Sequence, residues 1–81
     1  MPNRDKLLYF IMLRQMEASS DLIRMAYGRL SEAISGASGW DLRTVILDWL
    51  ETELRTLPEN SEGAGPQLMK AAVAMSHILK Q

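Results

Sequence analysis

The 81-residue sequence lacks cysteine altogether and contains one histidine, His77. The absence of cysteine excludes disulfide bonds and cysteine nucleophiles. A structural zinc site is not expected either, because such sites take four Cys or His ligands. A chain of this size buries only about 60% of the surface that its unfolded form exposes. Without a disulfide or a metal, we expect additional burial by self-association or by docking on a partner.

An excess of charge of one sign and long apolar runs are missing as well. The net charge of -1 gives no sign of a polyanion-binding protein, so nucleic acid is not an expected partner. The apolar run from Leu7 to Leu13 is interrupted by Arg14, and no small-residue cleavage site follows it. It is also far shorter than the ~18 apolar residues of a membrane span. The sequence therefore predicts a cytoplasmic protein without a membrane partner.

The sequence also has few residues in arrangements that support catalysis. General acid-base chemistry needs two or more titratable groups held close together, and His77 stands alone near the end of the chain. No serine lies in a nucleophile-elbow pattern. The glycine-bearing stretch from Ser35 to Gly39 has no following lysine and no preceding strand, as a phosphate-binding loop would. We predict no enzyme activity, no cofactor, no metal site and no catalytic residues.

What is present is helical periodicity. Two glycine-bearing segments, 35–39 and 58–66, divide the chain, and no stretch alternates apolar and polar residues as a strand would. In the first segment, apolar or small residues recur at spacings of three and four. They are Leu8, Met12, Met16, Ser19, Ile23, Ala26, Leu30 and Ala33. This stripe favours one continuous helix over about 4–35, with a break near Ser19-Ser20-Asp21 as the alternative, since Ser and Asp favour caps.

The residues that favour helix ends predict two further helices. Gly36 suits a left-handed position at the end of the first helix, and Ser38 suits the N-cap of a helix over about 39–57. An acidic loop follows over 58–65, and Pro66 is placed to begin a last helix over about 66–80. The predicted fold is therefore a single all-α domain over 1–81. It is a bundle of three helices, or four if the first one breaks, completed by dimerisation or by a partner.

Large adaptable side chains are numerous for so small a core. The stretch from Leu7 to Leu13 places apolar residues in nearly every direction around one helix, so two neighbouring helices cannot cover them all. Met-rich and aromatic surfaces are common at adaptable interfaces. A glycine within the first helix suggests a close helix crossing. The predicted partner or dimer interface is Tyr9, Phe10, Met12, Leu13, Met16, Ile23, Tyr27, Gly28 and Trp40.

Acidic residues are concentrated in the second half of the chain. Asp48, Glu51 and Glu53 fall on the second predicted helix, and Arg55 shares a face with the first two. The ordinary interpretation is a solvated and partly paired helix surface. The sharper interpretation is an acidic patch that docks on a basic partner.

These observations lead to two hypotheses of function. The favoured one is a non-enzymatic interaction module, such as a small adaptor, a chaperone, an antitoxin or a phage-type inhibitor, which binds a partner protein or itself through helix faces. The alternative is a nucleic-acid-associated transcriptional regulator, because two helices meet at a glycine turn within 20–57 as in a helix-turn-helix. The acidic second helix of that unit disfavours the alternative. No family resemblance is apparent in these residues.

Overall fold

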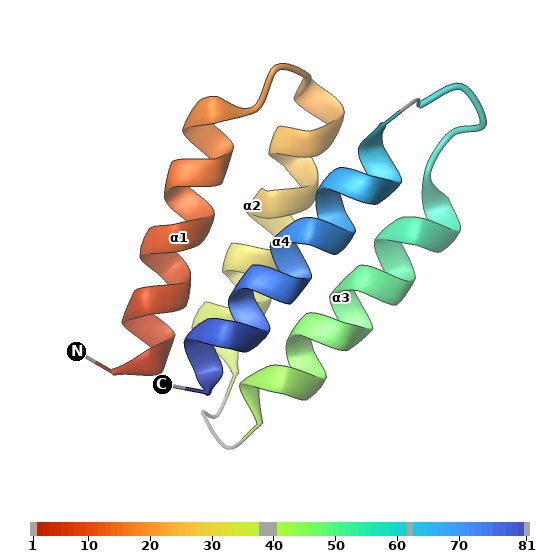
Figure 1. The fold of residues 1–81 in the computed structure, drawn as a ribbon. Helices are drawn as coiled ribbons and strands as arrows, with labels where there is room; N and C mark the ends of the chain where they lie inside the picture. The colour runs from red at the N-terminus through yellow and green to blue at the C-terminus, as the bar shows by residue number, and fades with distance from the viewer. Residues whose placement is uncertain (1, 38–40, 62, 81) are drawn as a thin grey trace.

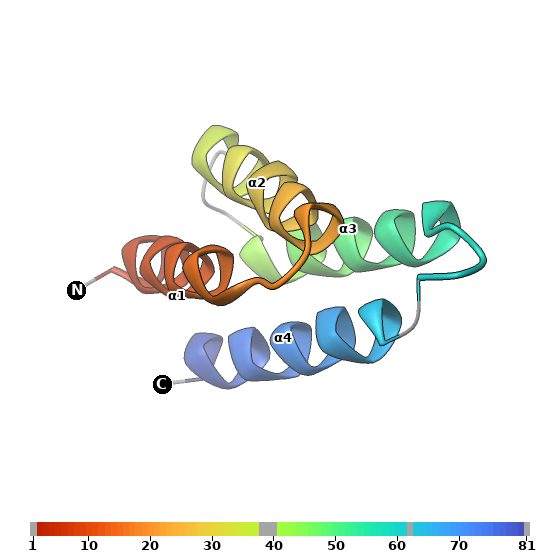
Figure 2. The ribbon, with the colours of Figure 1, turned by 90° about the horizontal axis from the view of Figure 1, so that it is seen from above.

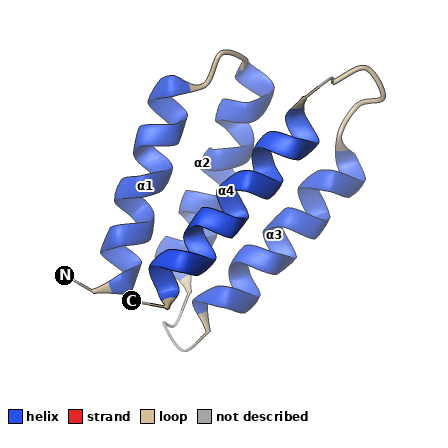
Figure 3. Cartoon of the chain, in the orientation of Figure 1, coloured by secondary structure: helices blue, strands red, loops and turns tan. Residues whose placement is uncertain are grey.

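The computed structural model describes residues 2–37, 41–61 and 63–80, which form four α-helices (Figures 1 and 3). Each helix runs antiparallel to the next, and α1 also packs against α4, so the four helices close around one core (Figure 2). Both chain ends lie at the same end of the bundle (Figure 1). The helices are α1 (Asn3–Glu17), α2 (Asp21–Gly36), α3 (Leu42–Thr56) and α4 (Ala64–Leu79). The prediction of an all-α fold is confirmed for the described residues.

The prediction of one continuous first helix is wrong, because the chain breaks between α1 and α2. Ala18 is extended, with φ -63° and ψ 129°, and the Oγ of Ser20 accepts a hydrogen bond from the Ile23 N–H at 3.2 Å. A helix over 4–35 would be about 48 Å long, whereas the longest extent of the molecule is 37 Å. The break allows the apolar faces of α1 and α2 to pack against each other. The four-helix alternative, with its break near Ser19-Ser20-Asp21, describes this part of the chain.

Side chains of α1 and α2 hold this helical hairpin together at both ends. Near the turn, Arg24 donates from Nη2 to the Ala18 carbonyl at 3.0 Å, and Gln15 donates from Nε2 to the Arg24 carbonyl at 3.2 Å. At the other end, Arg4 of α1 donates to the carbonyl of Ala37, which follows α2. Carbonyl groups at helix ends lack partners within the helix. The arginines therefore satisfy groups that the break and the helix end leave free.

The left-handed glycine lies in a different connection from the predicted one. Gly36 is the last residue of α2, and among the described glycines only Gly63 has a positive φ, of 79°. Glycine adopts this conformation without the steric penalty of a Cβ. Gly63 is the N-cap of α4, which begins at Ala64, two residues before the prediction. Pro66 still lies in the first turn, where a missing N–H breaks no helical hydrogen bond.

The helix α3 begins later than predicted because a different residue caps it. Asp41 is the N-cap, and its Oδ1 accepts a hydrogen bond from the Thr44 N–H at 3.1 Å. Ser38, the predicted N-cap, lies outside the described residues. At the other end, Leu57 is extended and precedes Pro58. A residue before proline disfavours the helical conformation, which explains why the end near 57 is predictable.

All four helices contribute to the core. The largest fully buried side chains are Leu7, Ile11, Leu30, Ile34, Leu68 and Met75. Small residues of α4, including Ala71 and Ala72, are buried beside them and permit close helix packing. The buried set also contains Ile23, Ala26, Tyr27, Ile46, Trp49 and Ala64. These fourteen residues form the hydrophobic core within the part of the chain that the structure describes.

Candidate protein-interaction surfaces

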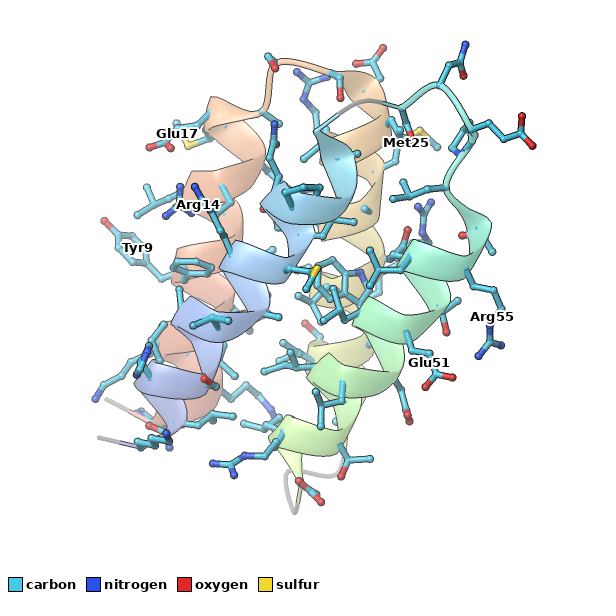
Figure 4. All side chains as sticks on the ribbon, turned by 45° about the vertical axis from the view of Figure 1, so that its right-hand side comes forward. Tyr9, Arg14, Glu17, Met25, Glu51 and Arg55 are labelled. Atoms are coloured by element: carbon cyan, nitrogen blue, oxygen red, sulfur yellow. The ribbon has the colours of Figure 1, made fainter. Side chains whose placement is uncertain are left out.

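An apolar stripe lies on the outward side of α1. Tyr9, Met12, Leu13 and Met16 are all exposed, with 58% of Tyr9 and 75% of Met16 accessible. Their spacing is i, i+3, i+4 and i+7, which places them on one face of the helix. Tyr9 points away from the bundle in Figure 4. These four residues, here called the α1 stripe, were all in the predicted interface.

Phe10, also in the predicted interface, borders the α1 stripe rather than belonging to it. Its ring is partly buried against the core, and the guanidinium carbon of Arg14 lies 5.1 Å from the ring centroid. Arg14 also forms a loose ion pair with Glu17, with 3.6 Å between Nη1 and Oε2. An exposed cation over an aromatic ring contributes about 0.5–1 kcal/mol. The charged edge of α1 therefore covers Phe10 and leaves the α1 stripe open.

Two other predicted interface residues are placed differently. Ile23 and Tyr27 are buried in the core of the chain itself, where the Tyr27 ring stacks on Trp49 with 6.1 Å between the centroids. The expectation that a continuous helix would leave them facing a partner is therefore wrong, because the break after Glu17 folds α2 back onto α1. Trp40 lies outside the described residues.

At Gly28 the structure shows a side-chain contact between α1 and α2 of the same chain, and the predicted close crossing with a partner stays a prediction. A Cβ added at Gly28 would lie 3.3 Å from the Nε2 of Gln15, tighter than most real contacts. This same Gln15 group donates to the Arg24 carbonyl. The small residue thus leaves room for a hydrogen bond between the two helices.

The predicted acidic patch does not form one surface. Glu53 is buried, with only 5% of its side chain accessible, and it binds Arg29 of α2 through two hydrogen bonds of 2.7 Å. Its inclusion in a solvent-facing patch is therefore wrong. Glu51 is exposed and pairs with Arg55 one turn further along α3 (Figure 4). Asp48 is exposed on the same helix. The ordinary interpretation, a partly paired surface, describes Glu51.

The contact between α2 and α3 satisfies its polar groups. Trp49 donates from Nε1 to the Ala26 carbonyl at 2.8 Å, and Arg29 and Glu53 form their two-pronged pair nearby. The hydrogen bond to Glu53 raises the pKa of Arg29, against the opposing effect of desolvation. An open groove of about 430 Å³ runs beside this contact, with Val45 and Trp49 in its lining. Helical periodicity does not predict the Arg29–Glu53 pair, because the two residues lie on different helices.

A smaller cleft lies between α1, α2 and α4. Its volume is about 270 Å³, and its lining includes Arg14, Tyr27, Gln67 and Lys70. Burial raises the pKa of Tyr27, and the positive charge of Arg14 partly opposes this effect. The cleft is lined by charged residues of both signs, because Glu17 also borders it.

A second exposed apolar surface was not predicted. Leu47 and Leu54 of α3 are exposed, as are Met69 and Val73 of α4. A Cβ at Gly65 of α4 would lie 3.5 Å from Leu54, so this side of α3 faces α4. The helical spacing of each pair places its two members on one face of their own helix.

Comparisons with known proteins leave function to be argued from these surfaces. The sequence matches no family model, and neither the curated proteins nor the solved structures yield a match. Within residues 2–37, 41–61 and 63–80, no three His, Asp or Glu side chains gather as a metal site would require. No helix in that part of the chain has the length and apolar character needed to cross a membrane.

Proposed function

We propose that this protein is an interaction module that binds a partner protein through the α1 stripe. The observation that carries the proposal is the exposure of Tyr9, Met12, Leu13 and Met16 together on one helix face. Scattered apolar side chains are normal on protein surfaces, whereas a contiguous apolar patch marks an interaction site. In this fold the stripe lies on the side of α1 that faces away from α2 and α4.

The spacing of the α1 stripe suits one mode of recognition in particular. Anchors at i, i+3, i+4 and i+7 are the pattern of a helix that lies in an apolar groove of another protein. Tyrosine brings a large contact area with few rotatable bonds, and methionine adapts to an irregular partner surface. The expected partner is therefore a protein with an apolar groove about two helical turns long.

The alternative function receives less support from the surface. A nucleic-acid regulator needs a helix that approaches phosphate groups with positive charge. The exposed side of α3 carries Asp48 and Glu51 together with Arg43 and Arg55, so its charges balance. This surface has no excess of positive charge to attract DNA or RNA.

Site-specific photo-crosslinking in cells of the source organism tests the proposal. A benzophenone amino acid at Met12 or Met16 is expected to capture the same partner protein. The same probe at Glu32, which is exposed on α2, serves as the matched control. The purified partner is then expected to bind the wild-type protein and to lose most of its affinity for Leu13→Asp.

Two results would contradict the proposal. One is capture of the same protein from Glu32 as from Met16, which would indicate contact without a specific surface. The other is unchanged binding of the purified partner to Leu13→Asp. Far-UV circular dichroism of Leu13→Asp excludes unfolding as the cause of a loss, since Leu13 is outside the buried core.

A further inference from the structure

The unpredicted apolar surface extends over two adjacent helices. Leu47 and Leu54 contribute from α3, Met69 and Val73 contribute from α4, and Leu50 of α3 is partly buried against the core. We call these five residues the α3–α4 face. The two helices lie side by side at one side of the bundle in both Figure 1 and Figure 2. The α1 stripe lies on a different helix, so the α3–α4 face is separate from it.

The two ends of the α3–α4 face carry opposite charges. Arg43 lies about one helical turn before Leu47, and Lys80 follows the end of α4 at the same end of the bundle. At the other end, Glu59 lies in the connection that follows α3, beyond Leu54 and the helix end at Thr56. All three charged residues are exposed. Between the ends, Glu51 and Arg55 neutralise each other by pairing.

This arrangement is complementary to itself. In a two-fold symmetric dimer, the same patch of both copies forms the interface, and antiparallel contact superimposes one end of the patch on the opposite end of its mate. The apolar centre of the α3–α4 face would then meet the same centre on the second copy. Arg43 and Lys80 of one copy would lie near Glu59 of the other at both ends of the contact, which favours this register over a parallel one.

The α3–α4 face is also wider than the α1 stripe, which suits contact with a second copy. A helix with its side chains is about 10–12 Å across, so a surface of two helices is twice as wide as the α1 stripe. The exposed apolar residues of the α3–α4 face come from both helices, whereas those of the α1 stripe come from one, so the α3–α4 face offers a second copy a broader apolar contact.

We infer that the α3–α4 face binds a second copy of this chain in an antiparallel, two-fold symmetric dimer, with Arg43 and Lys80 of each copy opposite Glu59 of the other. The inference does not rest on the proposed function of the α1 stripe. Dimerisation through α3 and α4 leaves the α1 stripe free, so the assembled protein presents two partner-binding helices.

Sedimentation velocity of the full chain tests the dimer. The wild-type protein is expected to dimerise at micromolar concentration, and Leu47→Glu and Val73→Glu are each expected to raise the dimer Kd at least about thirtyfold. The matched control is Met16→Glu, which places the same charge at an exposed apolar position of α1 and should leave Kd within about twofold. Circular dichroism of each variant verifies that the helices are retained.

Charge reversal tests the symmetry directly. Arg43→Glu and Glu59→Arg are each expected to raise the Kd of self-association about tenfold, because like charges then meet at both ends. An equimolar mixture of the two single variants should recover the wild-type Kd, since each heterodimer again joins opposite charges. Carbodiimide treatment of the wild-type protein should link Lys80 of one copy to Glu59 of the other.

Three outcomes would overturn the inference. The first is a wild-type protein that stays monomeric at high micromolar concentration. The second is a dimer that Met16→Glu disperses while Leu47→Glu and Val73→Glu leave it intact, which would place the contact on α1. The third is a mixture of Arg43→Glu and Glu59→Arg that associates no better than either variant alone, which would exclude the antiparallel register.

Discussion

The contact between α2 and α3 and the outward side of α1 use similar residues in opposite ways. Both contain a tyrosine among large apolar side chains, yet Tyr27 is buried in a stack on Trp49 while Tyr9 is largely exposed. At the α2–α3 contact, the indole N–H and the buried carboxylate both have partners on the other helix. The difference teaches that the placement of polar partners, more than aromatic content, separates a buried helix contact from an exposed apolar surface.

The largest expected difference is between two alanine substitutions, one of Trp49 at the α2–α3 contact and one of Met16 in the α1 stripe. Trp49→Ala removes a buried indole and leaves the Ala26 carbonyl without its donor, so we expect the free energy of unfolding to fall by about 3–5 kcal/mol. Met16→Ala removes a side chain that is mostly exposed and should change it by no more than about 0.5 kcal/mol. Urea denaturation followed by circular dichroism at 222 nm measures both.

Equal effects of these two variants would break the comparison. A loss of several kcal/mol for Met16→Ala would mean that the α1 stripe is covered in the folded protein. Unfolding at lower protein concentration distinguishes this case, because stability that depends on a second copy decreases when the protein is diluted.

A smaller effect is expected from breaking the two ion pairs of α3. Arg29→Met leaves the buried Glu53 carboxylate without its partner, and we expect a loss of about 3 kcal/mol, at the lower end of buried pairs because Arg29 itself is half exposed. Arg55→Met breaks the exposed pair with Glu51 and should cost less than about 1 kcal/mol. Thermal and urea unfolding of the two variants provide the comparison, and similar losses would contradict the burial of Glu53.

The all-helical fold could be predicted from the sequence because periodicity is a local property. Spacing of three and four identified the helical segments, and Pro58 placed the end of α3 within one residue. The break after Glu17 was harder to predict, since a stripe in phase through Ser19 fits a straight helix as well as a hairpin. The cap that Ser20 makes with Ile23 contributes only about 1 kcal/mol to the break, and the packing of α1 against α2, which periodicity does not show, accompanies it.

The candidate surfaces were predictable in part for a related reason. Apolar residues lie around most of the circumference of α1, which indicated that some of them stay exposed. Four of them form the α1 stripe. The partner of Glu53 was not predictable, because Arg29 is 24 residues away and lies on a different helix. The α3–α4 face was missed because the composition of one helix does not show which of its edges a neighbour leaves uncovered.

The smallest expected effect concerns the exposed N-terminus of α3, at the edge of the buried contact. Hydrogen bonds from the Thr44 hydroxyl and N–H lower the pKa of Asp41 in the folded protein. A lowered folded-state pKa means that this cap stabilises the fold above the unfolded value of about 3.9 and that its contribution is lost as pH falls through the folded value.

Amide hydrogen exchange of Thr44 between pH 2 and pH 6 measures this loss at the helix end. After correction for intrinsic exchange, protection in the wild-type protein should fall only at a pH below the unfolded value, where the folded-state carboxylate, with its lowered pKa, becomes protonated. Asp41→Asn keeps an acceptor that does not titrate, so its protection should stay nearly constant through the same range. Asp48→Asn is the control, because it neutralises an exposed aspartate of the same helix that is not its N-cap. If Asp48→Asn flattened the profile as much as Asp41→Asn, the acid sensitivity would come from the general charge of α3 rather than from its cap.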